Sequence, residues 1–568
     1  MLKIALLDLN HSTRGVHTNT VPLGLGLISA YLKKNIEKDI DIKLFKEVDK
    51  ALNTFKSWTP DVIGIAQYSW NSELNLYMGK LVKKINPECV VVAGGPNLDL
   101  SSEGKSEFLK TQEVDIGVMY DGEIPFCNIV KHILSGKSID EIKKNPLAGT
   151  YTLNQGKLVE SSEKPPRLNS LNEFGPIYSN GVFDNFLKRG YHPFVQTHRG
   201  CPFTCAFCHT SNSYYSKMLF LSPKIFREDM EHIGKFFEGR PDVVLYMANT
   251  NMGLFDEDFE IAKVIKEIQE KYNWPRFIDV NSGKDSKKLL KMLSIIKFQP
   301  AIALQTLTPH VLENIKRKNI PLNIYCEFQQ EVLKKTGETS TTELILSLPG
   351  ETKETFLKTL RTVMNSGVQN IVIYTLMNLK GTPIASKEFA NKYGNVIYYR
   401  IVPRQFSIIN GEKIFDTEEV VVSTKNMSFE DYLELRGISF VVNSFFSSTE
   451  LIPLKKFLLE YKIDIAKWIF NIHSKLSNYP DLYKNYESFL KETKEELFET
   501  RKKLVEFFNK EENYNDLVKG RKGDNLLRKY KCDVLSKNYK SYLELAISEV
   551  RKLVNEKLGD MLGDIMKY

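Results

Sequence analysis

Several features that mark other protein classes are missing from this sequence, and each absence narrows its possible roles. No apolar run approaches the ~18–20 residues of a membrane-spanning helix. The apolar start at Met1 is too short, and too soon interrupted by charge, for a secretory signal. The seven cysteines are odd in number and mostly scattered, so they do not form a disulfide framework. We therefore expect a protein of the reducing cytoplasm that has no membrane span.

The sequence also lacks a compact basic patch with interleaved aromatic residues. Its net charge of +8 results from 78 basic and 70 acidic residues that are interspersed along the chain. Hydrophobic residues make up 42% and charged residues 26%, as in ordinary globular proteins. The 568 residues suffice for about three to four domains. Nucleic acid is therefore not an expected partner, and the charge is interpreted as solvated surface.

Three of the seven cysteines, Cys201, Cys205 and Cys208, lie within eight residues. Thiolates favour zinc, copper(I) or iron–sulfur clusters. A structural zinc site needs four nitrogen or sulfur ligands, and no second Cys-x-x-Cys or His-x3-5-His follows. Three thiolates on a four-iron cluster would leave one iron open to a substrate or cofactor. An iron–sulfur cluster is the main hypothesis; a chance cluster and a zinc site completed by His209 remain alternatives.

The first 140 residues alternate strand-like apolar runs with amphipathic runs of helix length. This pattern predicts a parallel sheet covered on both faces. Strands are expected near 3–9, 40–45, 62–67, 90–93 and 114–119, and helices near 23–34, 74–85 and 123–134. Such sheets bind ligands at the carboxyl ends of their strands, here loops 18–25, 67–70, 94–96 and 121–123. A degenerate domain that binds nothing is the alternative, since Gly94 and Gly95 could simply end a strand in a turn.

Residues 141–191 are irregular and predict a linker with a hairpin near 150–159. From 192 to 400 about six strand–helix units predict a partial barrel whose active site lies at the carboxyl ends of the strands. The strands are expected near 243–248, 276–280, 301–305, 342–347 and 371–374. Glu343 lies inside one of them, where an unsatisfied carboxylate is costly. It is either a cofactor contact or a salt-bridged core carboxylate.

The region from 401 to 568 has mainly helical patterning, with helices expected near 429–446, 454–472 and 483–508. Val420 to Ser423 suggest the end of a small sheet. Aromatic residues such as Phe445 and Trp468 recur at helical intervals and are interpreted as a core-facing stripe. The position of the region makes it a candidate lid over the active site. Cys326 and Cys532 are expected to be ordinary thiols.

The cysteine spacing, with Phe207 just before the third cysteine, resembles the radical S-adenosylmethionine (SAM) superfamily. Runs 303–319 and 343–352 also resemble sequence blocks of that superfamily. The runs 21–25, 60–65, 92–96 and 121–123 resemble the cobalamin-binding domain that precedes many radical SAM cores. The expected fold is α/β: a doubly wound parallel sheet at 1–140, a linker at 141–191, a partial (β/α)6 barrel at 192–400 and a mostly helical region at 401–568.

The resemblance implies three cofactors and the residues that hold them. A [4Fe–4S] cluster would be ligated by Cys201, Cys205 and Cys208. The residues implied for SAM are Phe207, Asn249, Gln305 and Glu343. The residues implied for cobalamin are Gly24, Leu25, Tyr68, Gly94, Gly95, Pro96, Gly122 and Glu123.

Two departures from the family pattern bear on these assignments. Asn249 stands where family members often carry an acidic residue, so a contact with the SAM amino group would come from an amide instead. No histidine has Asp two residues before it, so the cobalt-ligating Asp-x-His-x-x-Gly motif is missing. If cobalamin binds, no histidine of that motif ligates its cobalt.

The implied reaction is methylation of an unactivated carbon of an unidentified substrate through a 5′-deoxyadenosyl radical. The electron donor would be a flavodoxin or ferredoxin. One alternative is a cobalamin-binding radical SAM enzyme that catalyses cyclisation or rearrangement. The other is a non-catalytic iron–sulfur binding protein. The sequence indicates no catalytic side chain beyond the cofactor contacts.

Overall fold

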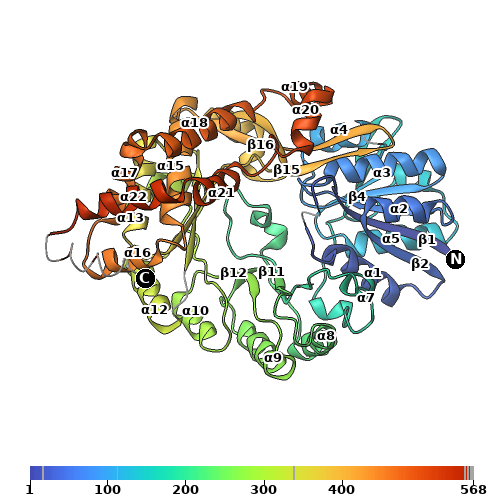
Figure 1. The fold of residues 1–568 in the computed structure, drawn as a ribbon. Helices are drawn as coiled ribbons and strands as arrows, with labels where there is room; N and C mark the ends of the chain where they lie inside the picture. Colours follow the sequence, from blue (N-terminus) through green and yellow to red (C-terminus); the bar gives the residue numbers. More distant parts are fainter. Residues whose placement is uncertain (16–17, 112, 337–339, 556–557, 559–561, 563–568) are drawn as a thin grey trace.

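The computed structural model describes all residues except 16–17, 112, 337–339, 556–557, 559–561 and 563–568. Figure 1 shows three parts along the chain: an N-terminal α/β module in blue, a half-barrel in green and yellow, and a mostly helical region in orange and red. A long hairpin in the third part extends back to the first module. This arrangement confirms the α/β fold class and the order of its parts.

The first module is a seven-stranded sheet of order β2-β1-β3-β4-β5-β6-β7, in which β1 to β5 are parallel. The parallel strands are β1 (Leu2–Asn10), β2 (Ile40–Glu47), β3 (Val62–Ala66), β4 (Val90–Gly94) and β5 (Ile116–Val118). The helices are α1 (Leu23–Asn35), α2 (Val48–Phe55), α3 (Ser72–Ile85), α4 (Ser102–Thr111), α5 (Glu123–Leu134) and α6 (Ile139–Lys144). Two separate apolar clusters lie on the two faces of the sheet, as expected for a doubly wound sheet.

The hairpin expected in the linker belongs to this sheet. Strands β6 (Thr150–Asn154) and β7 (Lys157–Glu160) pair antiparallel, and β6 pairs antiparallel with β5. Gly117 in β5 leaves room for the ring of Tyr151, because a Cβ at that glycine would overlap it. The sheet therefore continues beyond residue 140.

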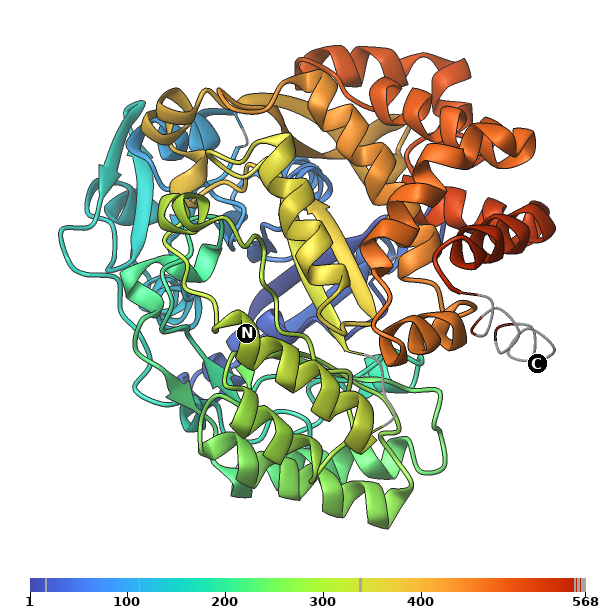
Figure 2. The same ribbon diagram turned by 90° about the vertical axis from the view of Figure 1, so that its left-hand side faces the viewer.

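The half-barrel is built from two groups of parallel strands, β8-β11-β12 and β13-β14. Its strands are β8 (Phe194–Val195), β11 (Leu245–Met252), β12 (Ile278–Ser282), β13 (Thr341–Leu346) and β14 (Asn370–Thr375). Its helices are α8 (Pro223–Phe236), α9 (Glu257–Tyr272), α10 (Ser286–Leu293), α11 (Pro309–Asn314), α12 (Leu322–Thr336) and α13 (Lys353–Met364). Figure 2 shows β13, β14 and α13, in yellow, between the green helices and the C-terminal helices.

The expected strand at 301–305 is present only as isolated bridges, from Ala301 to Thr341 and from Gln305 to Leu344. Gln305 has a positive φ of 63°, which an extended strand does not allow. The segment still lies beside β13, because the amide of Gln305 donates to the carbonyl of Glu343 at 2.8 Å. Together with the five strands, this irregular segment between β12 and β13 gives the half-barrel six strand positions.

The C-terminal part begins with α14 (Lys387–Tyr393) and a long antiparallel hairpin of β15 (Val396–Ile409) and β16 (Glu412–Ser423). The helices that follow are α15 (Phe429–Val441, continuing as a π-helical turn to Phe446), α16 (Ile452–Glu460), α17 (Ile465–Lys475), α18 (Pro480–Glu495), α19 (Arg501–Asn509), α20 (Glu511–Val518), α21 (Leu526–Lys537) and α22 (Tyr539–Arg551). Phe445 and Trp468 are fully buried, as the helical aromatic stripe predicted.

Two helices expected to be continuous are each divided in two. The helix expected at 454–472 breaks before Asp464, whose carboxylate accepts from the amide of Lys467 and caps α17. The helix expected at 483–508 breaks before Thr500, which caps α19 in the same way. Along the described stretches of the chain, no helix has the length and apolarity needed to cross a membrane.

Candidate active site

The cysteine loop follows a short strand, β9 (His198–Arg199), which pairs antiparallel with β10 (Leu219–Phe220). Gly200 has φ 113°, and a Cβ there would lie 2.7 Å from the carbonyl oxygen of Tyr215. The same carbonyl accepts the amide of Cys201 at 3.0 Å. Glycine is therefore required at position 200, where the chain turns into the loop.

The three thiols lie close together without converging on one point. The pKa of the Cys208 thiol is raised by burial and, to a lesser extent, by the neighbouring Cys201 and Cys205. Within the described residues, no three His, Cys, Asp or Glu side chains are placed to hold a single metal ion. Neighbouring but separated thiols suit the corners of a polynuclear cluster better than one mononuclear ion.

The zinc alternative gains no support from His209. Its Nε2 lies 2.9 Å from the carbonyl oxygen of Lys380, in the segment that follows β14. Burial lowers the pKa of His209, which favours the neutral ring at that contact. His209 lines a cavity instead of closing a thiol site.

Two of the residues implied for SAM lie side by side inside the half-barrel. Gln305 Nε2 is 3.5 Å from Glu343 Oε2, at the limit of a hydrogen bond. Gln305 is 6% exposed and its Oε1 has no hydrogen-bond partner. A buried amide without a partner, on a backbone with positive φ, is the kind of feature that a ligand would satisfy.

The carboxylate of Glu343 is also only partly compensated by its surroundings. Burial raises its pKa, and only the amide of Gln305 and the charge of Arg317 oppose that shift. Among the described residues, Glu343 does not form the close salt bridge that the core-carboxylate alternative requires, and its hydrogen bond to Gln305 is long. Its acceptor capacity is therefore available to a ligand in the half-barrel.

The other two residues implied for SAM have different surroundings. Phe207 packs against the apolar cluster that contains Ile345 and Leu348. Asn249 is fully buried, and its Oδ1 accepts the amide of Thr197 while its Nδ2 donates to Thr197 Oγ1 at 2.6 Å. These bonds tie β11 to the segment before β9, so Asn249 has a positioning function in the free protein.

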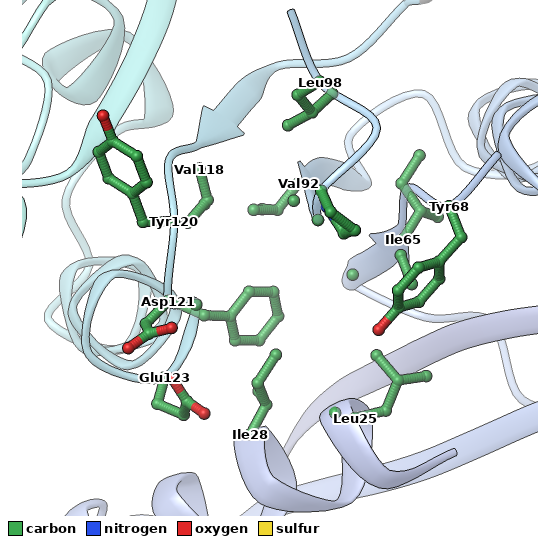
Figure 3. A pocket seen from close by; sticks show the side chains of 18 of the residues that line it. Leu25, Ile28, Ile65, Tyr68, Val92, Leu98, Val118, Tyr120, Asp121 and Glu123 are labelled. Atoms are coloured by element: carbon green, nitrogen blue, oxygen red, sulfur yellow. The ribbon is translucent and has the colours of Figure 1, made fainter. Parts of the chain in front are cut away.

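All eight residues implied for cobalamin line one cavity. Its volume is about 1240 Å³, including the part open to solvent. Figure 3 shows the side chains of Leu25, Tyr68, Val118 and Glu123 around it, at the carboxyl ends of the parallel strands. The glycine loops were the sequence signal for this site.

Glycines and the phenol of Tyr68 line part of the cavity. Gly24 leaves the space beside Tyr68 open, since a Cβ there would lie 3.6 Å from the phenol oxygen. Gly95 serves the backbone itself: its φ is 128°, and a Cβ would overlap the backbone of Gln67. Burial raises the pKa of Tyr68 far above its usual value, so a neutral phenol faces the cavity.

The far wall of the cavity comes from the half-barrel. It is formed by Arg199, His209, Asn212, Tyr215 and Gly381. Arg199 Nη1 donates to Glu123 Oε1 at 2.9 Å, and this ion pair joins the two modules. Arg199 precedes Cys201 by two residues and His209 follows Cys208 directly, so the residues on both sides of the cysteine loop line the cavity.

Several polar residues of the site were not among those that the family resemblance implied for a cofactor. Arg199 lies next to the cysteine motif, but nothing local indicates its ion pair with Glu123. Arg317 and Asn251 donate to Cys205 and Cys201, respectively. Lys284 lies over the ring of Phe203 at 4.2 Å, and burial and the charge of Arg317 lower its pKa to about 8.

The fold and the site define a two-module protein in which a ligand-binding parallel sheet faces a half-barrel that carries a three-thiol loop. Comparison with known families identifies both modules. Residues 13–130 match the B12 binding domain and residues 195–363 match the radical SAM superfamily. The chain therefore belongs to the proteins that combine a B12-binding domain with a radical SAM domain, and the cofactors of these two families are cobalamin, a [4Fe–4S] cluster and SAM.

Two curated relatives are similar to this chain in sequence. The cobalamin-dependent radical SAM methyltransferase TokK of Streptomyces tokunonensis is 26% identical over 443 residues, covering 74% of this chain and 62% of its own length. The 2-(S-pantetheinyl)-carbapenam-3-carboxylate methyltransferase of Streptantibioticus cattleyicolor is 26% identical over 394 residues, covering 66% and 56%. This chain thus spans less than two thirds of either relative.

Solved structures show the same fold. The cobalamin-dependent SAM radical enzyme OxsB, with aqua-cobalamin and SAM bound, aligns with a TM-score of 0.58 and 14% identity, covering 97% of this chain and 84% of OxsB. The radical SAM methyltransferase TsrM of Kitasatospora setae aligns with a TM-score of 0.54 and 12% identity, covering 73% and 85%.

Proposed function

We propose that this protein is a cobalamin-dependent radical SAM methyltransferase that methylates an unactivated carbon of a substrate still to be identified. The observation that carries the proposal is the shared cavity. One wall contains the eight residues implied for cobalamin, and the other contains Arg199 and His209, which flank the cysteine motif. A methyl carrier and a radical source would therefore act on the same space.

In this proposal the side chains of the protein bind and orient the cofactors and shield them from water. Cys201, Cys205 and Cys208 would hold the cluster, and the glycine loops of the first module would leave room for cobalamin in the cavity that they line. Gln305 and Glu343 offer an unpaired amide oxygen and a carboxylate to the polar groups of SAM. When bound, the cofactors supply a 5′-deoxyadenosyl radical for hydrogen abstraction and a methyl group for transfer.

Water exclusion comes from the contact between the two modules. In the Glu123–Arg199 ion pair, Glu123 is buried at 4% exposed and the Arg199 side chain is 12% exposed. Tyr120 stacks on Tyr214 at a centroid distance of 4.5 Å, and Asn212 donates to the Tyr120 hydroxyl at 3.2 Å. These contacts close the cavity beside the cysteine loop, where a reactive radical must be protected from solvent.

The test uses the full chain, reconstituted without oxygen with iron, sulfide and hydroxocobalamin, and given SAM with a one-electron reductant. Methyl transfer uses two SAM molecules, one giving 5′-deoxyadenosine and methionine and the other S-adenosylhomocysteine. We expect both adenosine products. The physiological electron donor is proposed to be a flavodoxin or ferredoxin, and each can replace the chemical reductant in the same assay.

A second function, cyclisation or rearrangement, is favoured by one comparison. The anaerobic magnesium-protoporphyrin IX monomethyl ester cyclase of Rubrivivax gelatinosus is 24% identical over 226 residues. Such a reaction predicts 5′-deoxyadenosine without S-adenosylhomocysteine. A non-catalytic iron–sulfur protein predicts neither product.

A further inference from the structure

Two buried hydrogen-bond donors lie against the thiols of the cysteine loop. Arg317 is 8% exposed, and its Nη1 is 3.7 Å from Cys205 Sγ. Asn251 is 5% exposed, and its Nδ2 is 3.4 Å from Cys201 Sγ. Both donors come from segments far along the chain, so the fold itself delivers them to the sulfur atoms.

The guanidinium of Arg317 is held rigidly in this position. Its Nε donates to Asn319 Oδ1 at 3.0 Å and its Nη2 donates to the carbonyl oxygen of Ala303. Asn319 is fixed in turn, since its Nδ2 donates at 2.8 Å to the carbonyl oxygens of Leu304 and Thr306. These partners are neutral, so the positive charge is not cancelled by them and acts on the sulfur atoms.

Asn251 is also oriented by its surroundings. Its Nδ2 contacts Thr250 Oγ1 at 3.0 Å, and that hydroxyl donates to the carbonyl oxygen of Gly200 at 2.9 Å. The end of β11 is thereby tied to the residue that opens the cysteine loop. One thiol thus faces a neutral donor and another faces a cation.

Donors and positive charge beside cluster sulfurs stabilise the reduced, more negative state and raise the reduction potential. We propose that Arg317, assisted by Asn251, sets the reduction potential of the iron–sulfur cluster held by Cys201, Cys205 and Cys208. This inference rests on the proposed cluster. In this proposal, Arg317 determines how readily an external one-electron reductant reduces the cluster before SAM binds.

The experiment measures the midpoint potential of the reconstituted full chain without SAM, by dye-mediated titration with dithionite under electron paramagnetic resonance. In Arg317→Met we expect the reduction equilibrium to fall at least tenfold, which is about 59 mV for a one-electron couple. Arg317→Lys keeps the charge and should retain most of the wild-type potential. Arg436→Met is the matched control, because Arg436 is 5% exposed in α15 and lies over Phe489. Its potential should equal that of the wild type.

The possible failures can be told apart. If Arg317→Met does not fold or assemble a cluster, Arg317→Gln, which removes the charge but keeps an amide donor on a shorter side chain, gives the second measurement and is also expected to lower the potential. A cluster with the wild-type potential in Arg317→Met or Arg317→Gln overturns the proposal. This holds even if the variant binds SAM more weakly. A wild-type chain that assembles no cluster overturns the proposed function instead.

Discussion

Gly24 offers a test in which fold stability and ligand binding should change in opposite directions. It is the second residue of α1, and a Cβ there would meet the Tyr68 hydroxyl at 3.6 Å, an ordinary contact. Alanine in place of a helical glycine stabilises by about 0.5–1 kcal/mol. We therefore expect Gly24→Ala to raise the melting temperature of the protein without cobalamin.

The same methyl group occupies space in the cavity that we assign to cobalamin. Overpacking a well-filled contact costs about 1–3 kcal/mol, so the dissociation constant of hydroxocobalamin should rise about 5- to 150-fold. Equilibrium dialysis and a thermal melt of the same sample measure the two effects. Gly79→Ala in α3 is the control, because Gly79 does not line the cavity and its Cβ would meet Val91 at 3.3 Å and Ile65 at 3.7 Å. Unchanged cobalamin affinity in Gly24→Ala, or a parallel loss of affinity and stability, would refute the reasoning.

Three further predictions follow from the site and the core. Glu343→Gln removes a carboxylate whose pKa is raised by burial, so stability should be kept while the dissociation constant of SAM rises about tenfold, near 1.4 kcal/mol; equal loss of stability and SAM affinity would support a core role instead. Replacing Cys201, Cys205 and Cys208 together by alanine should abolish bound iron and leave hydroxocobalamin binding intact, and iron retained in that variant would reject the ligand assignment. Burial, with a smaller contribution from the charge of Lys531, lowers the pKa of Lys455 from 10.5 to about 7. Between these two pKa values the unfolded state binds more protons than the folded state, so the free energy of unfolding should rise with pH by up to about 1.4 kcal/mol per pH unit. Urea denaturation at several pH values should show a flatter dependence in Lys455→Met, and an unchanged slope would contradict the assignment.

The sequence was sufficient to predict the first module because its signals are local. Its parallel strands are short runs rich in apolar residues, and β1, β4 and β5 are followed by loops with Gly, Pro or Asp. The ligand side of such a sheet follows from its topology. For that reason Gly24, Gly94 and Glu123, more than 20 residues apart from one another, could be assigned to one site, and the structure gathers them in one cavity. Their role as cobalamin contacts stays a prediction.

The remaining features depend on contacts that no local pattern encodes. The segment at 301–305 has the composition of a strand, but the positive φ of Gln305 prevents regular pairing. Arg317 reaches Cys205 across 112 residues, and Arg199 reaches Glu123 across 76. The hairpin of β15 and β16 was largely missed because charged residues such as Arg400 and Glu418 pair with each other across it, which hides the alternation of a strand.

The end of this hairpin makes the first module dependent on the last third of the chain. Asp416 accepts the amides of Glu73 and Leu74 at the start of α3, and its Oδ2 lies 2.7 Å from Nε2 of the buried His11. Ile409 and Ile414 also belong to the apolar cluster on that face of the sheet. During synthesis, residues 1–160 leave the ribosome long before these partners exist, so α3 lacks its cap and the cluster lacks part of its cover. A truncated protein that ends after the half-barrel would keep that incomplete face, and we expect it to aggregate where the full chain stays monodisperse.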